Sequence, residues 1–148
     1  MMKALKLLCT GLILSASIQA SAQDCESIVN ICHDHLENGS SKGKKKSRFV
    51  SDGQVYTAFL DREKAEFKTT FFGGSTYRIA ASAGSDDDYV IFTIRDIQGN
   101  ILFSNRNHKN SPYWDFKVPS TLPVIIETEL DLDKKVTGCA VMLIGFQK

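Results

Sequence analysis

Three consecutive aspartates, Asp86, Asp87 and Asp88, form the densest group of candidate metal ligands in the sequence. Clustered carboxylates in a loop suit Ca²⁺, which takes roughly six to eight oxygen ligands. Dedicated calcium loops alternate their ligands with other residues, because consecutive side chains cannot all turn toward one ion without a strongly bent backbone. We therefore favour an ordinary solvated turn. The three aspartates stay as weak calcium candidates, and no other metal or cofactor is expected.

Cys32 and His35 are the one pair that suggests nucleophilic catalysis, three positions apart on a predicted helix. Cys32 falls on the apolar stripe of that helix, however, where thiols are usually inert. His33 and His35 lie on different faces of a helix and cannot jointly hold a metal. The sequence lacks G-x-S-x-G, H-E-x-x-H and the glycine-rich phosphate-binding motifs. We expect no enzymatic activity, with a small cysteine hydrolase as a remote alternative.

Aromatic residues concentrate around the sole tryptophan, Trp114. Alternation along a strand places Trp114 on the same face as Phe116 and Val118, and Tyr113 on the other face. We expect Trp114 to lie in the core, which leaves Tyr113 as the better candidate for an exposed contact with a sugar. His108, in a polar loop, indicates nothing specific.

The segment from Lys42 to Arg48 contains five basic residues. It could attract anionic glycans or a membrane surface without specificity, although a solvated loop over residues 40–48 is favoured. Nucleic acid is not an expected partner for an exported protein.

The first 22 residues read as an export signal. A short basic start with Lys3 and Lys6 precedes a mostly apolar run from Leu7 to Ile18, and Ala20-Ser21-Ala22 is a small-x-small cleavage site. The apolar run is too short to span a bilayer. We expect a mature domain of residues 23–148, periplasmic or extracellular, with no transmembrane segment. Loss of two lysines changes the formal net charge from +1 to −1, so no strongly charged partner is implied.

Three cysteines remain after residue 22: Cys25, Cys32 and Cys139. In an oxidising compartment, one disulfide and one free thiol is the simplest arrangement. Cys25 and Cys32 would lie about 10 Å apart along a helix, farther than the roughly 7 Å between Cα atoms that a disulfide tolerates. Cys139 is the expected partner of one of them. Cys25 is favoured because a disulfide between Cys25 and Cys139 would hold a chain end. A disulfide between Cys32 and Cys139, or three free thiols, are the alternatives.

The remaining pattern predicts one helix followed by about eight short strands. Apolar positions between residues 24 and 37 recur with helical spacing, and Asn38-Gly39 supplies a stop. Gly73-Gly74 reads as a hairpin turn. The expected strands cover residues 54–60, 65–72, 76–81, 89–95, 101–104, 113–118, 124–130 and 139–146. We predict a mainly β fold: an antiparallel, jelly-roll-like β-sandwich with one short N-terminal helix.

Four segments between Val55 and Gln147 carry a resemblance to a known family. The resemblance is to an uncharacterised family of small exported proteins from Bacteroidetes-type bacteria, and the segments are Val55-Tyr56-Thr57-Ala58, Glu66-Phe67-Lys68, Phe71-Phe72-Gly73-Gly74-Ser75-Thr76-Tyr77-Arg78-Ile79 and the closing run from Gly138 to Phe146. The resemblance implies a β-sandwich similar in architecture to pre-peptidase C-terminal domains, which are accessory and non-catalytic.

The sequence thus leads to an exported, non-catalytic accessory or binding protein of the bacterial cell envelope. The expected partner is an envelope protein, or alternatively a glycan or calcium bound by the sandwich. Ligand identity and oligomeric state stay open.

Overall fold

The computed structural model describes residues 25–37, 49–84 and 88–147. One helix precedes eight strands, with a short 3₁₀ helix η1 (Asn105–His108) between the fifth and the sixth strand. The elements are α1 (Cys25–Glu37), β1 (Phe49–Asp61), β2 (Lys64–Phe71), β3 (Ser75–Ser82), β4 (Val90–Asp96), β5 (Ile101–Ser104), β6 (Tyr113–Val118), β7 (Leu122–Leu130) and β8 (Thr137–Gln147). The predicted helix and every predicted strand are present, and the expected end of the helix at Asn38-Gly39 lies outside the described residues.

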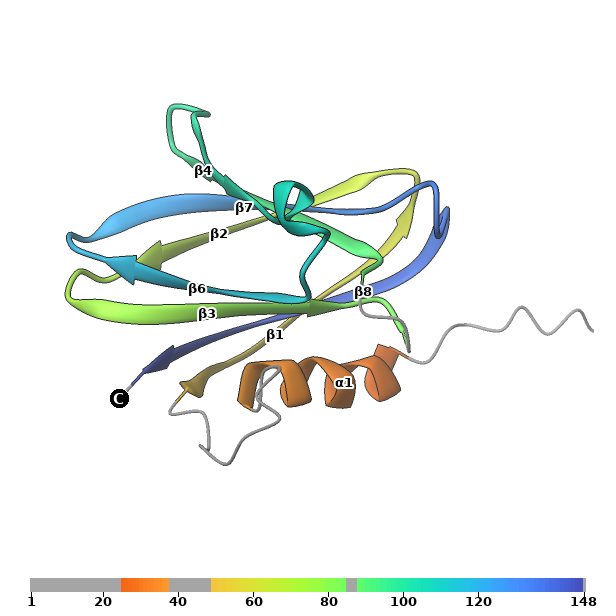
Figure 1. The fold of residues 1–148 in the computed structure, drawn as a ribbon, viewed down its shortest axis with the longest axis horizontal. Helices are drawn as coiled ribbons and strands as arrows, with labels where there is room; N and C mark the ends of the chain where they lie inside the picture. The colour runs from red at the N-terminus through yellow and green to blue at the C-terminus, as the bar shows by residue number, and fades with distance from the viewer. Residues whose placement is uncertain (1–24, 38–48, 85–87, 148) are drawn as a thin grey trace, which may run out of the picture.

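The strands form two antiparallel sheets of four that pack face to face (Figure 1). The strand order is β1-β8-β3-β6 in the sheet that α1 covers, here called the helix-side sheet, and β2-β7-β4-β5 in the opposite sheet. The pairs β1·β8, β2·β7, β3·β6 and β4·β5 are all hydrogen-bonded. Such pairing arises when one long hairpin of eight strands folds over on itself. The predicted jelly-roll sandwich is therefore confirmed.

The connection at Gly73-Gly74 differs from the prediction. β2 pairs with β7, and β3 pairs with β6 and β8, so Gly73-Gly74 crosses from one sheet to the other and does not close a hairpin. The two glycines signal a reversal of the chain, and Gly74 indeed has a φ of +84°. A local reversal does not determine whether the strands on either side of it pair.

β1 begins earlier than predicted, at Phe49. The sequence Ser51-Asp52-Gly53 resembles a turn but forms a bulge in β1, where the register with β8 shifts between Ser51 and Val55. Gly53 takes a φ of +86°, which suits glycine. The ladder with β8 then continues to Asp61.

The main core lies between the two sheets and is built from alternate residues of their strands. Along β2, half-buried Ala65, Phe67 and Thr69 alternate with exposed residues. β4 is buried on both faces, as expected for an inner strand. The largest buried side chains of this core include Phe92, Ile79, Ile126, Met142 and Ile144.

A second apolar cluster lies under α1, which packs along the outer face of the helix-side sheet (Figure 1). Ile28, Cys32 and Leu36 project from the helix onto Ala80, Val141 and Leu143. Gly145 allows this approach, because a Cβ there would lie 2.8 Å from Leu36 Cδ1.

Both ends of α1 are attached to the sheet. Cys25 forms a disulfide with Cys139 on β8, with Cα atoms 5.7 Å apart; this is the pair that the sequence favours. At the other end, Arg78 of β3 donates hydrogen bonds to the carbonyl oxygens of Leu36 and His35, at 3.2 Å and 3.4 Å. Within the described part of the chain, no helix has the length and apolar character needed to cross a membrane.

Candidate functional site

The aspartate group is only partly visible, since Asp86 and Asp87 lie outside the described residues. Asp88 forms an ion pair with Lys134, whose Nζ also lies 3.9 Å from Asp131 Oδ2. Asn110 donates hydrogen bonds to Asp131 Oδ2 and to the backbone carbonyl of Asp88. A lysine ammonium thus neutralises the carboxylate of Asp88. Residues 25–37, 49–84 and 88–147 contain no group of three side chains suited to hold a metal.

Cys32 is fully buried beneath α1. Its Sγ lies 3.2 Å from the carbonyl oxygen of Ala80, toward which the thiol donates. Burial raises the pKa of the Cys32 thiol to about 12, partly offset by a backbone hydrogen bond from Leu143. The thiol is therefore protonated at neutral pH and has no access to substrate, which removes the basis for a cysteine nucleophile.

Tyr113 does not match the prediction of an exposed contact. Its face of β6 turns toward the helix, where the ring is half-buried against the apolar cluster under α1. The guanidinium of Arg78 lies over the Tyr113 ring, with Cζ 4.6 Å from the centroid. The alternation along β6 is correct, but the sequence does not show that α1 covers the outer face of this sheet.

Trp114 faces the main core as predicted, although it is only partly buried. Its ring packs against Phe103 and His108, at centroid distances of 5.1 Å and 4.2 Å. Phe103 also meets Phe116 edge-on at 5.0 Å. These rings, here called the ring cluster, join β5, η1 and β6, and so close part of the seam between the two sheets. The sequence gives no signal that His108 belongs to this cluster.

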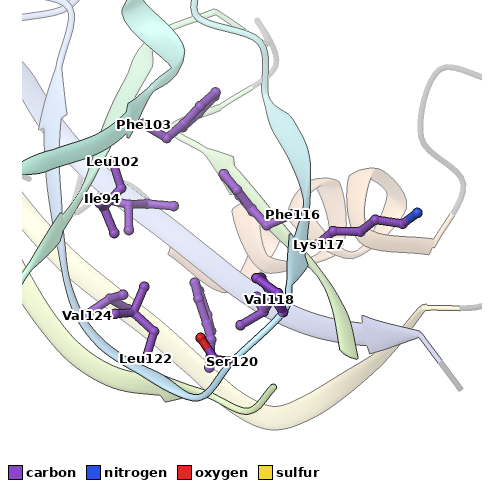
Figure 2. Close-up of a pocket in the computed structure, with 11 residues that line it drawn as sticks. Ile94, Leu102, Phe103, Phe116, Lys117, Val118, Ser120, Leu122 and Val124 are labelled. Atoms are coloured by element: carbon purple, nitrogen blue, oxygen red, sulfur yellow. The ribbon is translucent and has the colours of Figure 1, made fainter. Parts of the chain in front are cut away.

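An apolar pocket opens in the same seam, next to the ring cluster (Figure 2). Its cavity has a volume of about 250 Å³. Ile94, Leu102 and Phe103 lie on one side, and Phe116 and Val118 of β6 lie on the other (Figure 2). The remaining lining residues are Phe71, Lys117, Pro119, Ser120, Leu122 and Val124. Lys117 points away from the cavity (Figure 2), so the interior suits an apolar group.

Tightly packed turns build the end of the sandwich that contains this pocket. Gly73 lies so close to the β6–β7 turn that a Cβ there would be 2.8 Å from the Cα of Ser120. Its backbone N–H donates to Thr121 Oγ1 at 3.1 Å, and the Gly74 N–H donates to the Val118 carbonyl at 2.7 Å. These contacts hold the β2–β3 and β6–β7 turns together, so this side of the pocket is preformed.

Large apolar side chains are exposed at this same end of the sandwich. Phe72 is 63% exposed, Ile97 68%, Ile101 60% and Leu102 49%. They come from the β2–β3 turn and from the β4–β5 hairpin, which lie at the left of Figure 1. Together with the pocket, we call these four residues the apolar end. Of the four, Leu102 lines the pocket, and exposed apolar groups of this size are typical of binding surfaces.

The outer face of the opposite sheet has a different character. Lys64 of β2 pairs with Glu127 and Glu129 of β7 at 2.8 Å and 3.3 Å. Arg95 lies 3.7 Å from Glu127, and Arg106 reaches Glu129. The aromatic side chains found exposed, Phe59 and Phe72, lie elsewhere, on β1 and in the β2–β3 turn. The described residues of this face therefore offer no ring on which a sugar could stack.

No model of a known protein family matches this chain, and no curated protein is significantly similar to it.

The sequence does not reveal the pocket. Most of its lining consists of ordinary apolar side chains, contributed by β2, β4, β5, β6 and β7, and the β6–β7 turn completes it. A cavity among such residues depends on how two edge strands diverge in space, and no short motif encodes that.

Proposed function

We propose that this protein is an exported, non-catalytic accessory protein of the bacterial cell envelope, and that it binds another protein through its apolar end. The observation that carries the proposal is the apolar pocket at the end of the sandwich where four large apolar side chains are exposed, one of which, Leu102, lines the pocket. Binding energy at protein interfaces concentrates where a large side chain fills a pocket and excludes water. The apolar end offers such a pocket.

Other surfaces of the described residues support binding less well. The ion pairs across the opposite sheet lie at the surface and are partly exposed, and surface pairs contribute at most about 1 kcal/mol each. Burying one large apolar side chain contributes about 1.5–3 kcal/mol. A partner therefore gains more from the apolar end than from the charged face.

Export follows from the signal proposed for residues 1–22 and agrees with the Cys25–Cys139 disulfide, which is typical of oxidising compartments. The mature chain would begin at Gln23. The resemblance to small exported proteins of pre-peptidase-like architecture points to the same accessory role.

The test compares two variants that make the same chemical change at opposite ends of the sandwich. Ile101→Glu places a charge at the apolar end, and Val136→Glu places one at the far end, where Val136 is 45% exposed. Tagged protein is purified from the envelope of the producing cells, and the proteins that accompany it are quantified by mass spectrometry. We expect a partner that accompanies the wild type and Val136→Glu and is lost with Ile101→Glu. Equal recovery with both variants, or no partner with the wild type, contradicts the proposal.

A further inference from the structure

β6 is an edge strand whose second side pairs with no strand in the described part of the chain. The Ala81 N–H donates to the Pro112 carbonyl at 2.8 Å. The register pairs Ile79 with Trp114. The bond from Ala81 therefore shows that Trp114 and Phe116, like Pro112, direct their backbone groups toward β3. Because hydrogen-bonding direction alternates along an antiparallel strand, the N–H and C=O groups of Asp115 and Lys117 point to the open side.

The apolar pocket lies directly beside this open edge. Phe116 and Val118 of β6 turn their side chains inward and line the cavity. Lys117 turns to the other face, is exposed, and forms no ion pair with the described residues. Asp115 on that face is already neutralised by Arg78, whose Nε and Nη2 donate to the carboxylate at 2.6 Å and 3.0 Å. The edge therefore presents a net positive charge next to an apolar cavity.

We propose that β6 receives an extended segment of the partner protein as an added strand of the helix-side sheet. This inference rests on the proposed function and specifies its mode of binding. Backbone groups of the segment bond to those of Asp115 and Lys117, and one apolar side chain enters the pocket. Because side chains alternate along a strand, the next residue of the segment lies opposite Lys117, where a carboxylate complements the charge.

The size of the pocket favours one side chain over a complete small ligand. Sites for drug-sized molecules occupy roughly 300–1,000 Å³, whereas this cavity has about 250 Å³. Added strands characteristically combine main-chain hydrogen bonds with pockets for alternate side chains. Lysine and proline on an edge strand discourage unselective pairing, and Lys117 and Pro119 stand at this edge. An acidic residue in the segment compensates the positive charge of Lys117 and so permits pairing at this edge.

The test uses the mature chain and a capped peptide of alternating Thr and Val with a central Phe followed by Glu. Backbone amide signals of the ¹⁵N-labelled protein are followed during titration with the peptide. We expect saturable shifts, with slowed hydrogen exchange at the amides of Asp115 and Lys117. Absence of saturable shifts overturns the inference.

Two matched peptides test the backbone pairing. In an antiparallel added strand, the Glu of the peptide lies opposite Lys117 and directs its N–H to β6, while the N–H of the neighbouring Phe points away. Methylating the Glu nitrogen should weaken binding by about tenfold, as loss of a main-chain hydrogen bond and a steric clash imply. Methylating the Phe nitrogen should change little. Equal affinity of the two methylated peptides overturns strand addition.

A charge reversal tests the role of Lys117. Replacing the Glu of the peptide by Lys should weaken binding to the wild type, and Lys117→Glu in the protein should restore it. No restoration overturns the role of charge. The two proposals separate if the peptide fails to bind while the Ile101→Glu variant still fails to recover the partner from cells. In that case the proposed function stands and strand addition alone is wrong.

Discussion

Cys32 shows how its surroundings determine the chemistry of a single residue. With the pKa of its buried thiol raised to about 12, the folded protein keeps the proton at a pH where the unfolded chain, with a thiol pKa near 9, releases it. Unfolding therefore becomes easier as pH rises above about 9, and the contribution of the neutral thiol is complete only below that pH.

We predict that the unfolding free energy of the wild type, relative to Cys32→Ala, falls by about 1 kcal/mol per pH unit above pH 9. Urea unfolding of both proteins across that range measures the difference, and subtraction removes the groups that the two share. A difference that stays constant with pH would show that the Cys32 thiol titrates alike in the folded and the unfolded protein.

The burial of Cys32 also predicts that a thiol reagent at neutral pH reacts with it only after denaturation.

Arg78 joins several polar contacts of the helix-side sheet. Besides Asp115 and the end of α1, it contacts the rings of Phe49 and Tyr113, with Cζ 4.3 Å and 4.6 Å from their centroids. A lysine cannot form the forked pair or stack in this way. The side chain is thus fixed by its planar shape as much as by its charge.

We predict that Arg78→Lys lowers the unfolding free energy by about 1–3 kcal/mol, measured by urea unfolding. Arg95→Lys is the matched control, because Arg95 is more exposed and lies 3.7 Å from Glu127, so its loss should cost less than about 1 kcal/mol. Equal effects of the two substitutions would refute the structural role given to Arg78.

At the scale of elements, the disulfide that joins α1 to β8 closes a long loop, with a sequence separation of 114. Such a bond stabilises mainly by restricting the unfolded chain, by up to about 4–5 kcal/mol in the entropy model. We predict that the double variant Cys25→Ser with Cys139→Ser loses about 2–5 kcal/mol of stability, measured by thermal and urea unfolding.

Reduction of the wild type is the matched control, since it breaks the same bond without substitution. The reduced wild type and the double variant should unfold alike. A variant as stable as the oxidised wild type would mean that packing under α1 suffices to hold the helix.

Alternation and spacing predicted the elements well because burial on one face determines them locally. β5 and β6 have the predicted bounds, and Trp114 and Phe116 face the main core as expected. Errors arose where an outcome depends on another part of the chain. Gly73-Gly74 reverses the chain without pairing its flanking strands, and Tyr113 is covered by a helix about 80 residues earlier in the sequence.

At the scale of the whole molecule, the jelly roll brings two edge strands, β5 and β6, to one seam. The ring cluster closes part of that seam, and the pocket occupies another part. The sequence predicted a sandwich, but it could not locate this site, because the apolar residues of the lining follow the same pattern as core residues. Two of the candidates that the sequence suggested, Cys32 and Tyr113, lie beneath α1, where Cys32 is buried and Tyr113 is half-buried.

Site-specific photocrosslinking tests most directly whether the apolar end binds a partner. A photoreactive phenylalanine analogue replaces Leu102 at the mouth of the pocket or, as control, Val136 at the far end; the two native side chains are similarly exposed. Irradiation of the producing cells should join the partner to the protein labelled at position 102 and leave the control unmodified. No adduct from position 102, or equal adducts from both positions, would contradict the account.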